Sequence, residues 1–245
     1  MSFTQIAQVY DRFNDLEVYE HWLDFTMNAC NEQPHKVLDV ACGTGWFTQL
    51  LAPFCEEVVA FDIDAAMLEV ACNEQGASEN IRYLQADMLN LSAFDTDFDL
   101  ATCYADSLCF LQNEAQLQQA FVQIANRLRE GGTFLFDVWT PYQVTRGFDG
   151  FNYFDSDDEY ALLWDSEVDG WQATHYLTVF RKQASGLYER IDTTLIERTY
   201  PLATYLEALR QASFKQIEVF VDYGATHYDE QVHETADRWF FRCVK

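Results

Sequence analysis

Lysine and arginine are scarce in this chain of 245 residues: there are 15 of them against 40 aspartates and glutamates, a formal net charge of −25. No stretch clusters the basic residues. A field of this sign repels the phosphate backbone of DNA or RNA at long range. The composition therefore argues against a nucleic-acid partner, and it leaves open a local basic groove. An acidic surface of this size is also common for solubility alone.

Long hydrophobic runs are missing too. No apolar run reaches the length of about 18 residues that a membrane-spanning helix needs, and MSFTQIAQVYDRF at the N-terminus lacks the apolar stretch of a signal peptide. The seven cysteines are odd in number and irregular in spacing, which excludes a regular disulfide framework and is typical of small core residues in a reducing compartment. The five histidines contain no pair with metal-ligand spacing. We expect a cytoplasmic protein with no membrane segment and no metal.

The first 140 residues alternate between strand-like and helical patterns. After an amphipathic helical region over 4–30, helices are predicted over 65–75, with Asp64 as N-cap, and over 114–129, with Asn113 and Gln116 at its start and Gly131-Gly132 ending it. Strands separated by helices of this length form a parallel sheet with right-handed crossovers. The predicted strands are KVLDVA (36–41), EVVAFD (57–62), IRYLQA (81–86), FDLATCY (98–104) and TFLFDV (133–138).

The pattern changes near residue 148. Three long strand-like segments, 159–168, 172–183 and 188–200, are joined by Asp-Gly and Ser-Gly turns, which indicates antiparallel hairpins. A helix over 201–211 and strands over 214–223 and 237–245 follow. We predict an α/β fold: a Rossmann-like seven-stranded sheet, mostly parallel with an antiparallel last strand, formed by residues 1–147 and 200–245. Residues 148–199 form an inserted antiparallel sheet that serves as a substrate cap or a dimer contact.

The turn after the first strand, in VLDVACGTGWFT, predicts a ligand site. Ligands bind at the carboxyl ends of the strands in an open parallel sheet, where this turn lies, and glycines let the backbone approach a ligand closely. A dinucleotide site favours a third glycine where Thr48 stands, and a phosphate-binding loop needs Gly-Lys-Ser/Thr, which is absent. Asp39, shortly before Gly43 and Gly45, favours a ligand that carries positive charge.

Two further aspartates end the next two strands. Asp62 is placed to accept both ribose hydroxyls and Asp87 to reach an adenine edge, while Ile63, Met67 and Met88 offer apolar contact with the base. A ligand with an ammonium, a sulfonium, a ribose and an adenine but no phosphate is S-adenosylmethionine.

VLDVACGTGWFT, VVAFDID and LQADM, in this order and spacing, resemble the motifs of class I S-adenosylmethionine-dependent methyltransferases. CYADSLCFL and LREGGTFLFDV are similar to the fourth and fifth strand segments of that family. AQVYDRF and ERTYP resemble a bacterial branch that carries an antiparallel insertion and is related to N-methyltransferases acting on amino sugars and glycine. The resemblance implies that the cofactor is bound by the following residues: Tyr10, Asp39, Ala41, Cys42, Gly43, Thr44, Gly45, Asp62, Ile63, Met67, Asp87, Met88 and Tyr104.

Methyl transfer from a sulfonium needs the acceptor lone pair held about 3 Å from the methyl group, with water excluded. Tyr104, Asp106 and His175 are the candidates for a general base, and proximity alone is the alternative. We expect a small-molecule acceptor, methylated on nitrogen or oxygen. A non-catalytic cofactor-binding regulator and an RNA methyltransferase remain the competing interpretations, the second disfavoured by charge. A homodimer formed through the insertion is a further possibility.

Overall fold

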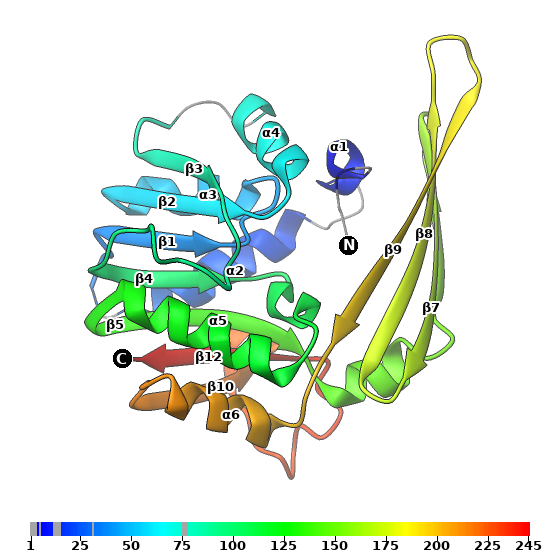
Figure 1. Ribbon diagram of the computed structural model, residues 1–245. Helices are drawn as coiled ribbons and strands as arrows, with labels where there is room; N and C mark the ends of the chain where they lie inside the picture. The colour runs from blue at the N-terminus through cyan, green and yellow to red at the C-terminus, as the bar shows by residue number, and fades with distance from the viewer. Residues whose placement is uncertain (1–3, 5, 12–15, 31, 75–77) are drawn as a thin grey trace.

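The computed structural model describes residues 4, 6–11, 16–30, 32–74 and 78–245. Two separate sheets organise the chain (Figure 1). The large sheet has eight strands in the order β11-β10-β12-β5-β4-β1-β2-β3, and the small sheet has four in the order β6-β7-β8-β9. The strands of the large sheet are β1 (Lys36–Val40), β2 (Glu57–Asp62), β3 (Ile81–Gln85), β4 (Phe98–Cys103), β5 (Leu128–Trp139), β10 (Gln216–Val221), β11 (Thr226–His227) and β12 (Arg238–Val244).

The five strands β1 to β5 are parallel, and β12 runs antiparallel to β5. This confirms the Rossmann-like, mostly parallel sheet with an antiparallel last strand that the sequence predicts. The fold follows from the sequence because β1, β2 and β4 are almost wholly buried apolar runs, as strands covered on both faces must be.

Helices cover both faces of the large sheet (Figure 1). The aromatic and aliphatic side chains of α5 and α6 pack in one core cluster, and those of α2 and α3 pack in another on the opposite face. The predicted caps are present: Asn113 accepts a hydrogen bond from the Gln116 amide at the start of α5, and Asp64 accepts one from the Ala66 amide at the start of α4. The helices are α1 (Ala7–Tyr10), α2 (Leu16–Ala29), α3 (Trp46–Leu51), α4 (Ala65–Glu74), α5 (Glu114–Arg127) and α6 (Leu202–Gln211), with shorter turns η2 (Ala52–Phe54), η3 (Ser107–Phe110), η4 (Gln143–Gly147) and η5 (Asp222–Gly224).

The small sheet is built from β6 (Asn152–Ser156), β7 (Tyr160–Asp169), β8 (Gln172–Lys182) and β9 (Tyr188–Arg198), all antiparallel. It rises beside the carboxyl ends of the parallel strands, with α1 next to it (Figure 1). Its inner face buries Leu162, Leu177 and Val179 against Ile6, so the N-terminal segment lies against the small sheet.

Three details differ from the sequence prediction. The strand β6 is an addition to the three predicted strands of the insertion, and all five of its residues are exposed, so no burial pattern marked it. Gly131 and Gly132 lie within β5 rather than ahead of it, where the pairing with β4 shifts register. The two-residue β11 makes the large sheet eight-stranded. Arg12 and Phe13 of the AQVYDRF motif lie outside the described residues.

Candidate active site

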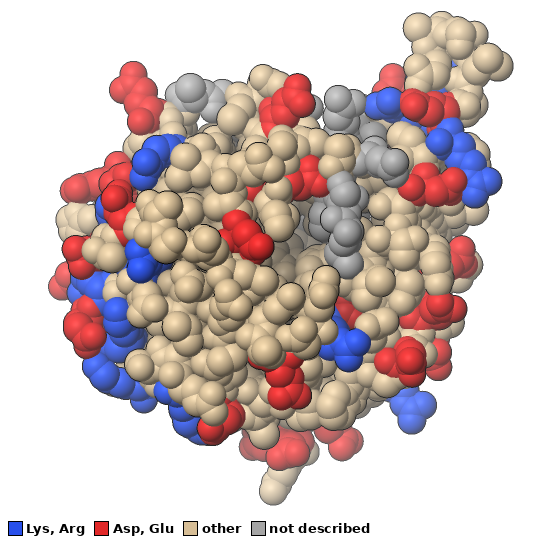
Figure 2. Space-filling view, viewed as in Figure 1, with Lys and Arg blue, Asp and Glu red and all other residues tan. Residues whose placement is uncertain are grey.

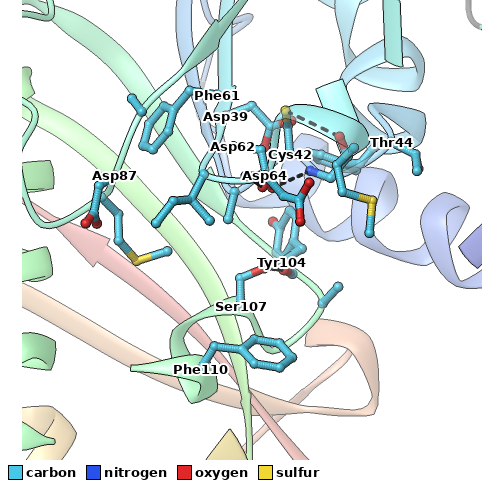
Figure 3. Close-up of a pocket in the computed structure, with 18 of the residues that line it drawn as sticks. Asp39, Cys42, Thr44, Phe61, Asp62, Asp64, Asp87, Tyr104, Ser107 and Phe110 are labelled. Carbon is cyan, nitrogen blue, oxygen red and sulfur yellow. Dashed lines mark hydrogen bonds between the residues drawn. The ribbon is translucent and has the colours of Figure 1, made fainter. Parts of the chain in front are cut away.

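A cavity of about 390 Å³ lies at the carboxyl ends of β1, β2 and β4 (Figure 3). Its wall contains twelve of the thirteen residues predicted to bind the cofactor, and among the predicted set only Gly45 is not part of that wall. The lining also contains residues that the sequence did not single out as ligand-binding. Those are Tyr19, Trp22, Phe47, Phe61, Asp64, Ala86, Leu89, Ala105, Ser107, Phe110, Leu111, Gln112 and Gln116.

The glycine turn presents bare backbone to this cavity. Ala41 and Gly43 both have positive φ, 56° and 55°, and a Cβ built on Gly43 would meet no atom within 4 Å. The space beside Gly43 is therefore open for a ligand to approach the main chain. Gly45 serves packing: a Cβ there would lie 2.6 Å from the Tyr83 hydroxyl oxygen, beneath the turn.

Asp39 lies at the floor of the cavity and is 3 % exposed. Its two carboxylate oxygens accept hydrogen bonds from the hydroxyls of Thr48, at 2.6 Å, and Thr102, at 2.8 Å. Burial raises the pKa of Asp39 to about 6, although the two hydroxyls lower it. Among the residues that the structure describes, Asp39 has no cationic side-chain partner, so its carboxylate is costly to ionise, and a positively charged ligand group would stabilise it.

Asp62 ends β2 and is held rigidly by the backbone around it. One carboxylate oxygen accepts from the Gly43 amide at 2.9 Å and the other from the Asp64 amide at 2.8 Å. A carboxylate has about four acceptor sites, so Asp62 can accept another donor besides the amides of Gly43, Asp64 and Ile63. Burial raises the pKa of Asp62, which those amides oppose. Two fixed acceptor oxygens at the end of the second strand suit two adjacent ligand hydroxyls.

The outer part of the wall is apolar and open. Ile63 lines the cavity and is 66 % exposed. Met88, which follows Asp87 in the chain, also lines the cavity and is half-buried. One carboxylate oxygen of Asp87 accepts a hydrogen bond from the Leu89 amide at 2.9 Å, which fixes the orientation of the side chain. An exposed apolar side chain next to fixed polar acceptors favours a flat, partly polar ligand such as a base.

The remaining predicted residues close the cavity from the N-terminal side. Tyr10, in α1, and Met67, in α4, line it, and Thr44 donates its hydroxyl to Asp11 at 2.7 Å, which joins the glycine turn to the N-terminal segment. Cys42 lines the turn itself, and burial raises its pKa well above the usual value for a thiol. It is therefore a neutral, small wall residue rather than a nucleophile.

The three candidate bases are placed differently. Tyr104 lines the cavity, but its hydroxyl is 2.8 Å from that of Thr26 and burial raises its pKa. The neighbours Ala105 and Ser107 line the cavity, whereas Asp106 between them pairs with Arg238 at 2.8 Å. His175 is buried in the small sheet, 2.7 Å from the Ser166 hydroxyl, and is not part of the cavity wall.

Comparison with known proteins gives the family. Residues 37–132 match the family described as "Methyltransferase domain". Over its full length the chain is 30% identical to GWCH70_2453 of Geobacillus sp. (strain WCH70), a protein named as a methyltransferase, and covers 100% of it. The chain belongs to the class I S-adenosylmethionine-dependent methyltransferases.

Solved structures agree. A S-adenosylmethionine-dependent methyltransferase from Clostridium acetobutylicum ATCC 824 superposes with a TM-score of 0.84 at 25% identity, covering 98% of this chain and 95% of that one. CalS10 of Micromonospora echinaspora, an amino pentose methyltransferase solved with S-adenosylmethionine bound, has the same fold, with a TM-score of 0.76 at 18% identity over 97% of this chain and 94% of that one. S-adenosylmethionine is the cofactor of this family, and the open space at Gly43, the buried Asp39 and the fixed oxygens of Asp62 fit it.

We expect Asp62→Ala to weaken S-adenosylmethionine binding by about 1–3 kcal/mol, because the ribose hydroxyls lose a charged acceptor. Calorimetric titration measures this. Asp62→Asn keeps one acceptor oxygen for the turn and should lose less. Asp95→Ala, an exposed change at the opposite end of the sheet, is the matched control. If Asp62→Ala binds as tightly as the wild type, Asp62 does not contact the cofactor.

Proposed function

We propose that the protein transfers the methyl group of S-adenosylmethionine to a small molecule, on nitrogen or oxygen, and that an amine is the favoured acceptor. The observation that carries this proposal is the charge of the cavity. Four aspartates, Asp39, Asp62, Asp64 and Asp87, line it, and none of the described lining residues is Lys, Arg or His.

This charge selects among acceptors. A carboxylate or phosphate would meet repulsion with no compensating cation among the described wall residues, whereas an amine, cationic in water, would be attracted. The amino pentose named for CalS10 is an acceptor of this chemical class, which supports the proposal.

The distribution of basic side chains disfavours an RNA acceptor. Lys36, Arg82, Arg129, Lys215 and Lys245 stand at or next to the opposite ends of their strands, the edge of the sheet away from the cavity. In Figure 2 the blue side chains gather mainly along that edge. Phosphate contacts beside the cavity would need basic residues there.

The described wall residues support a mechanism of positioning. Bound in the cavity, S-adenosylmethionine supplies an electrophilic methyl group on its sulfonium. Tyr104 stays protonated at neutral pH, since burial raises its pKa, and its hydroxyl is held by Thr26. The wall therefore aligns the acceptor and excludes water, and a cationic amine must first release its proton to solvent so that its nitrogen lone pair can attack the methyl group. Asp106 and His175 are not part of this wall.

The small sheet, residues 148–199 with its flanking turns, is proposed as a cap over this region, because its inner face already packs on the N-terminal segment that closes the cavity. Its outer aromatic residues, including Phe154 and Trp171, offer the alternative of a dimer contact. Sedimentation of the purified protein distinguishes a monomer from a homodimer. No helix in the described ranges is long and apolar enough to cross a membrane.

The test is a transfer assay with methyl-labelled S-adenosylmethionine. Amino sugars, amino acids, hydroxy compounds and bulk tRNA are offered separately, and products are identified by mass spectrometry. We expect label in a small amine. Label in tRNA alone would replace the proposal with RNA methylation, and tight cofactor binding with no acceptor in a full metabolite extract would support a regulatory protein. Asp62→Ala serves as the low-activity control.

A further inference from the structure

Behind the cavity wall, charged side chains from four distant parts of the chain meet. Asp106 follows β4, Asp137 lies in β5, Glu197 comes from β9 of the small sheet and Arg238 from the start of β12. Asp137 is fully buried and Glu197 is 6 % exposed. Two of the carboxyl groups, those of Asp106 and Asp137, pair with the Arg238 guanidinium, and Glu197 lies beside Asp106, so their arrangement depends on how that charge and any proton are distributed.

Arg238 forms ion pairs with two carboxylates and stacks on an aromatic ring. Its Nη2 lies 2.8 Å from Asp106 Oδ1 and its Nη1 pairs with Asp137 Oδ2. The guanidinium carbon lies 3.7 Å from the centroid of the Trp139 ring, a stacked position that only a planar cation uses fully. Asp137 Oδ2 also accepts the backbone amide of Asp106 at 3.4 Å. Arg238 therefore restrains both the side chain and, through Asp137, the main chain of Asp106.

The restrained segment is strained. Ala105 and Asp106 have φ values of 56° and 50°, in the left-handed region that costs non-glycine residues free energy and persists only where surrounding contacts hold it. The flanking residues Tyr104, Ala105 and Ser107 line the cofactor cavity. The contacts of Asp106 therefore determine where this part of the wall lies.

The small sheet supplies a second restraint. Strand β9 packs against η3, and Glu197 lies close enough to Asp106 for each carboxyl group to shift the pKa of the other. A proton on either carboxyl group would let it donate a hydrogen bond to the other. Burial raises the pKa of both to about 7, and Arg238 opposes this at Asp106. Burial therefore favours a proton on one member of the pair, and the two groups repel each other when both are ionised.

The other groups that face the pair do not titrate in this range. His175 Nε2 is 3.4 Å from Glu197 Oε2, but burial lowers the pKa of His175 to about 4, so the ring is neutral. Tyr10, from α1, and Cys109, from η3, feel both carboxyl groups, and burial raises the pKa of each well above its usual value. Asp137 and Arg238 complete the surroundings and are paired with each other.

We propose that Arg238 and Glu197 are positioning residues for methyl transfer: together they hold the turn of residues 104–107 in the shape that lines the cofactor cavity. Arg238 does so from the core sheet and Glu197 from the small sheet, so the small sheet is tied directly to the wall. When both carboxyl groups are ionised, their repulsion opens the second restraint. Only the kinetic consequences of this proposal rest on the proposed function.

The first test is hydrogen exchange of the full-length protein, which needs no acceptor. The amides of Asp106, Ser107 and Cys109 report on the turn, since they donate to Asp137 Oδ2, Tyr104 O and Asp106 O. We expect Arg238→Met to lower their protection by at least about tenfold, and Arg238→Lys, which keeps one ion pair, to lie between. Arg242→Met, in the same strand but paired with Glu218, is the matched control and should leave these amides unchanged. Unchanged protection in Arg238→Met, or an equal loss over the whole chain, would overturn the proposal.

Glu197→Gln gives the independent pH readout, and it decides the matter even if Arg238→Met fails to fold. Its amide donates to Asp106 without titrating. In the wild type, protection corrected for intrinsic exchange should fall as the pH rises through 7, and in Glu197→Gln it should stay constant. The same fall in both proteins, or none in the wild type, contradicts the proposed role of Glu197.

Once an acceptor is identified, kcat is measured against pH for the wild type and for Glu197→Gln. Ionisation of the acceptor affects both proteins equally, so it cancels in the ratio of wild-type kcat to variant kcat. We expect this ratio to fall above pH 7. Arg238→Met should lower kcat by a larger factor than it raises the Kd of S-adenosylmethionine, because the displaced turn lines only part of the cofactor cavity. A Kd that rises in parallel with the loss of kcat would count against positioning. Absence of any acceptor contradicts the proposed function alone, because the exchange results stand without it.

Discussion

Asp39→Asn is expected to make the free protein more stable at neutral pH and, at the same time, to weaken its binding of S-adenosylmethionine. The carboxyl group has a pKa of about 6 in the folded chain against 3.8 for an unperturbed aspartate, because it is buried. Folding must therefore pay for a buried carboxylate at pH 7, by about 3 kcal/mol for a difference of about two pKa units. The asparagine removes that cost, and the hydroxyls of Thr48 and Thr102 can rotate to suit its amide.

The pH dependence gives the sign of this effect. Below the unfolded-state pKa, Asp39 is protonated in both states and the variant should have the stability of the wild type. As the pH rises from about 4 to above 6 the wild type loses stability relative to the variant, and the difference then stays constant. Urea unfolding at pH 3 and pH 7.5 measures both limits. A variant that is less stable than the wild type at pH 7.5 would show that the ionised carboxylate does not destabilise the ligand-free protein.

Binding should change in the opposite direction. The positive charge of S-adenosylmethionine stabilises the ionised form of Asp39, so wild-type affinity should decline below about pH 6 and Asp39→Asn should bind roughly tenfold more weakly or worse at pH 7.5. Calorimetric titration across this range tests it, with Asp95→Asn, exposed and far from the cavity, as the control. Equal affinities of variant and wild type at pH 7.5 would place the positive charge of the ligand elsewhere.

Phe136→Ala is expected to cost about 3–5 kcal/mol of unfolding free energy, the range for removing a fully buried aromatic ring. Phe136 lies in β5 with no exposed surface, stacked on Phe241 of β12 at 4.5 Å between ring centroids and 5.4 Å from Phe121 of α5. It thus joins the parallel part of the sheet, the antiparallel last strand and the helix layer, and the surrounding β-strands have little freedom to collapse into the space.

Denaturant unfolding of the purified variant measures this cost. Phe154→Ala in β6 is the matched control, because the same side chain is 62 % exposed there and its removal should change stability by less than about 0.5 kcal/mol. A loss below about 1 kcal/mol in Phe136→Ala would mean that the core repacks around the missing ring.

The cofactor site was largely predictable because its residues sit at the ends of locally recognisable strands. Asp39 and Asp62 lie near the ends of the buried strands β1 and β2, Gly43 follows β1 and Asp87 follows β3, and parallel strands bring their carboxyl ends to one edge. Gly45 was predicted for the same reason but is required by Tyr83 beneath the turn, a contact between β3 and the turn after β1 that spacing alone does not reveal.

The strand β6 could not be predicted from burial, because both of its faces are exposed. It pairs with β7 through Tyr153 and Trp164, so its existence depends on a neighbour rather than on its own alternation. The glycine pair at 131–132 misled for a related reason: glycines commonly end helices, and here the strand β5 continues through them with a register shift.

What could be predicted from the chain in isolation is the sequence of alternating strands and helices, the parallel sheet that they form and the identity of the cofactor, since each depends on patterns within about twenty residues. The meeting of Asp106, Asp137, Glu197 and Arg238 came only from the folded molecule. Those residues are 31 to 132 positions apart from Asp106 and single charges carry no periodic signal. Strand pairing and the packing of the small sheet against the core bring them together, and burial then strengthens the interactions between their charges.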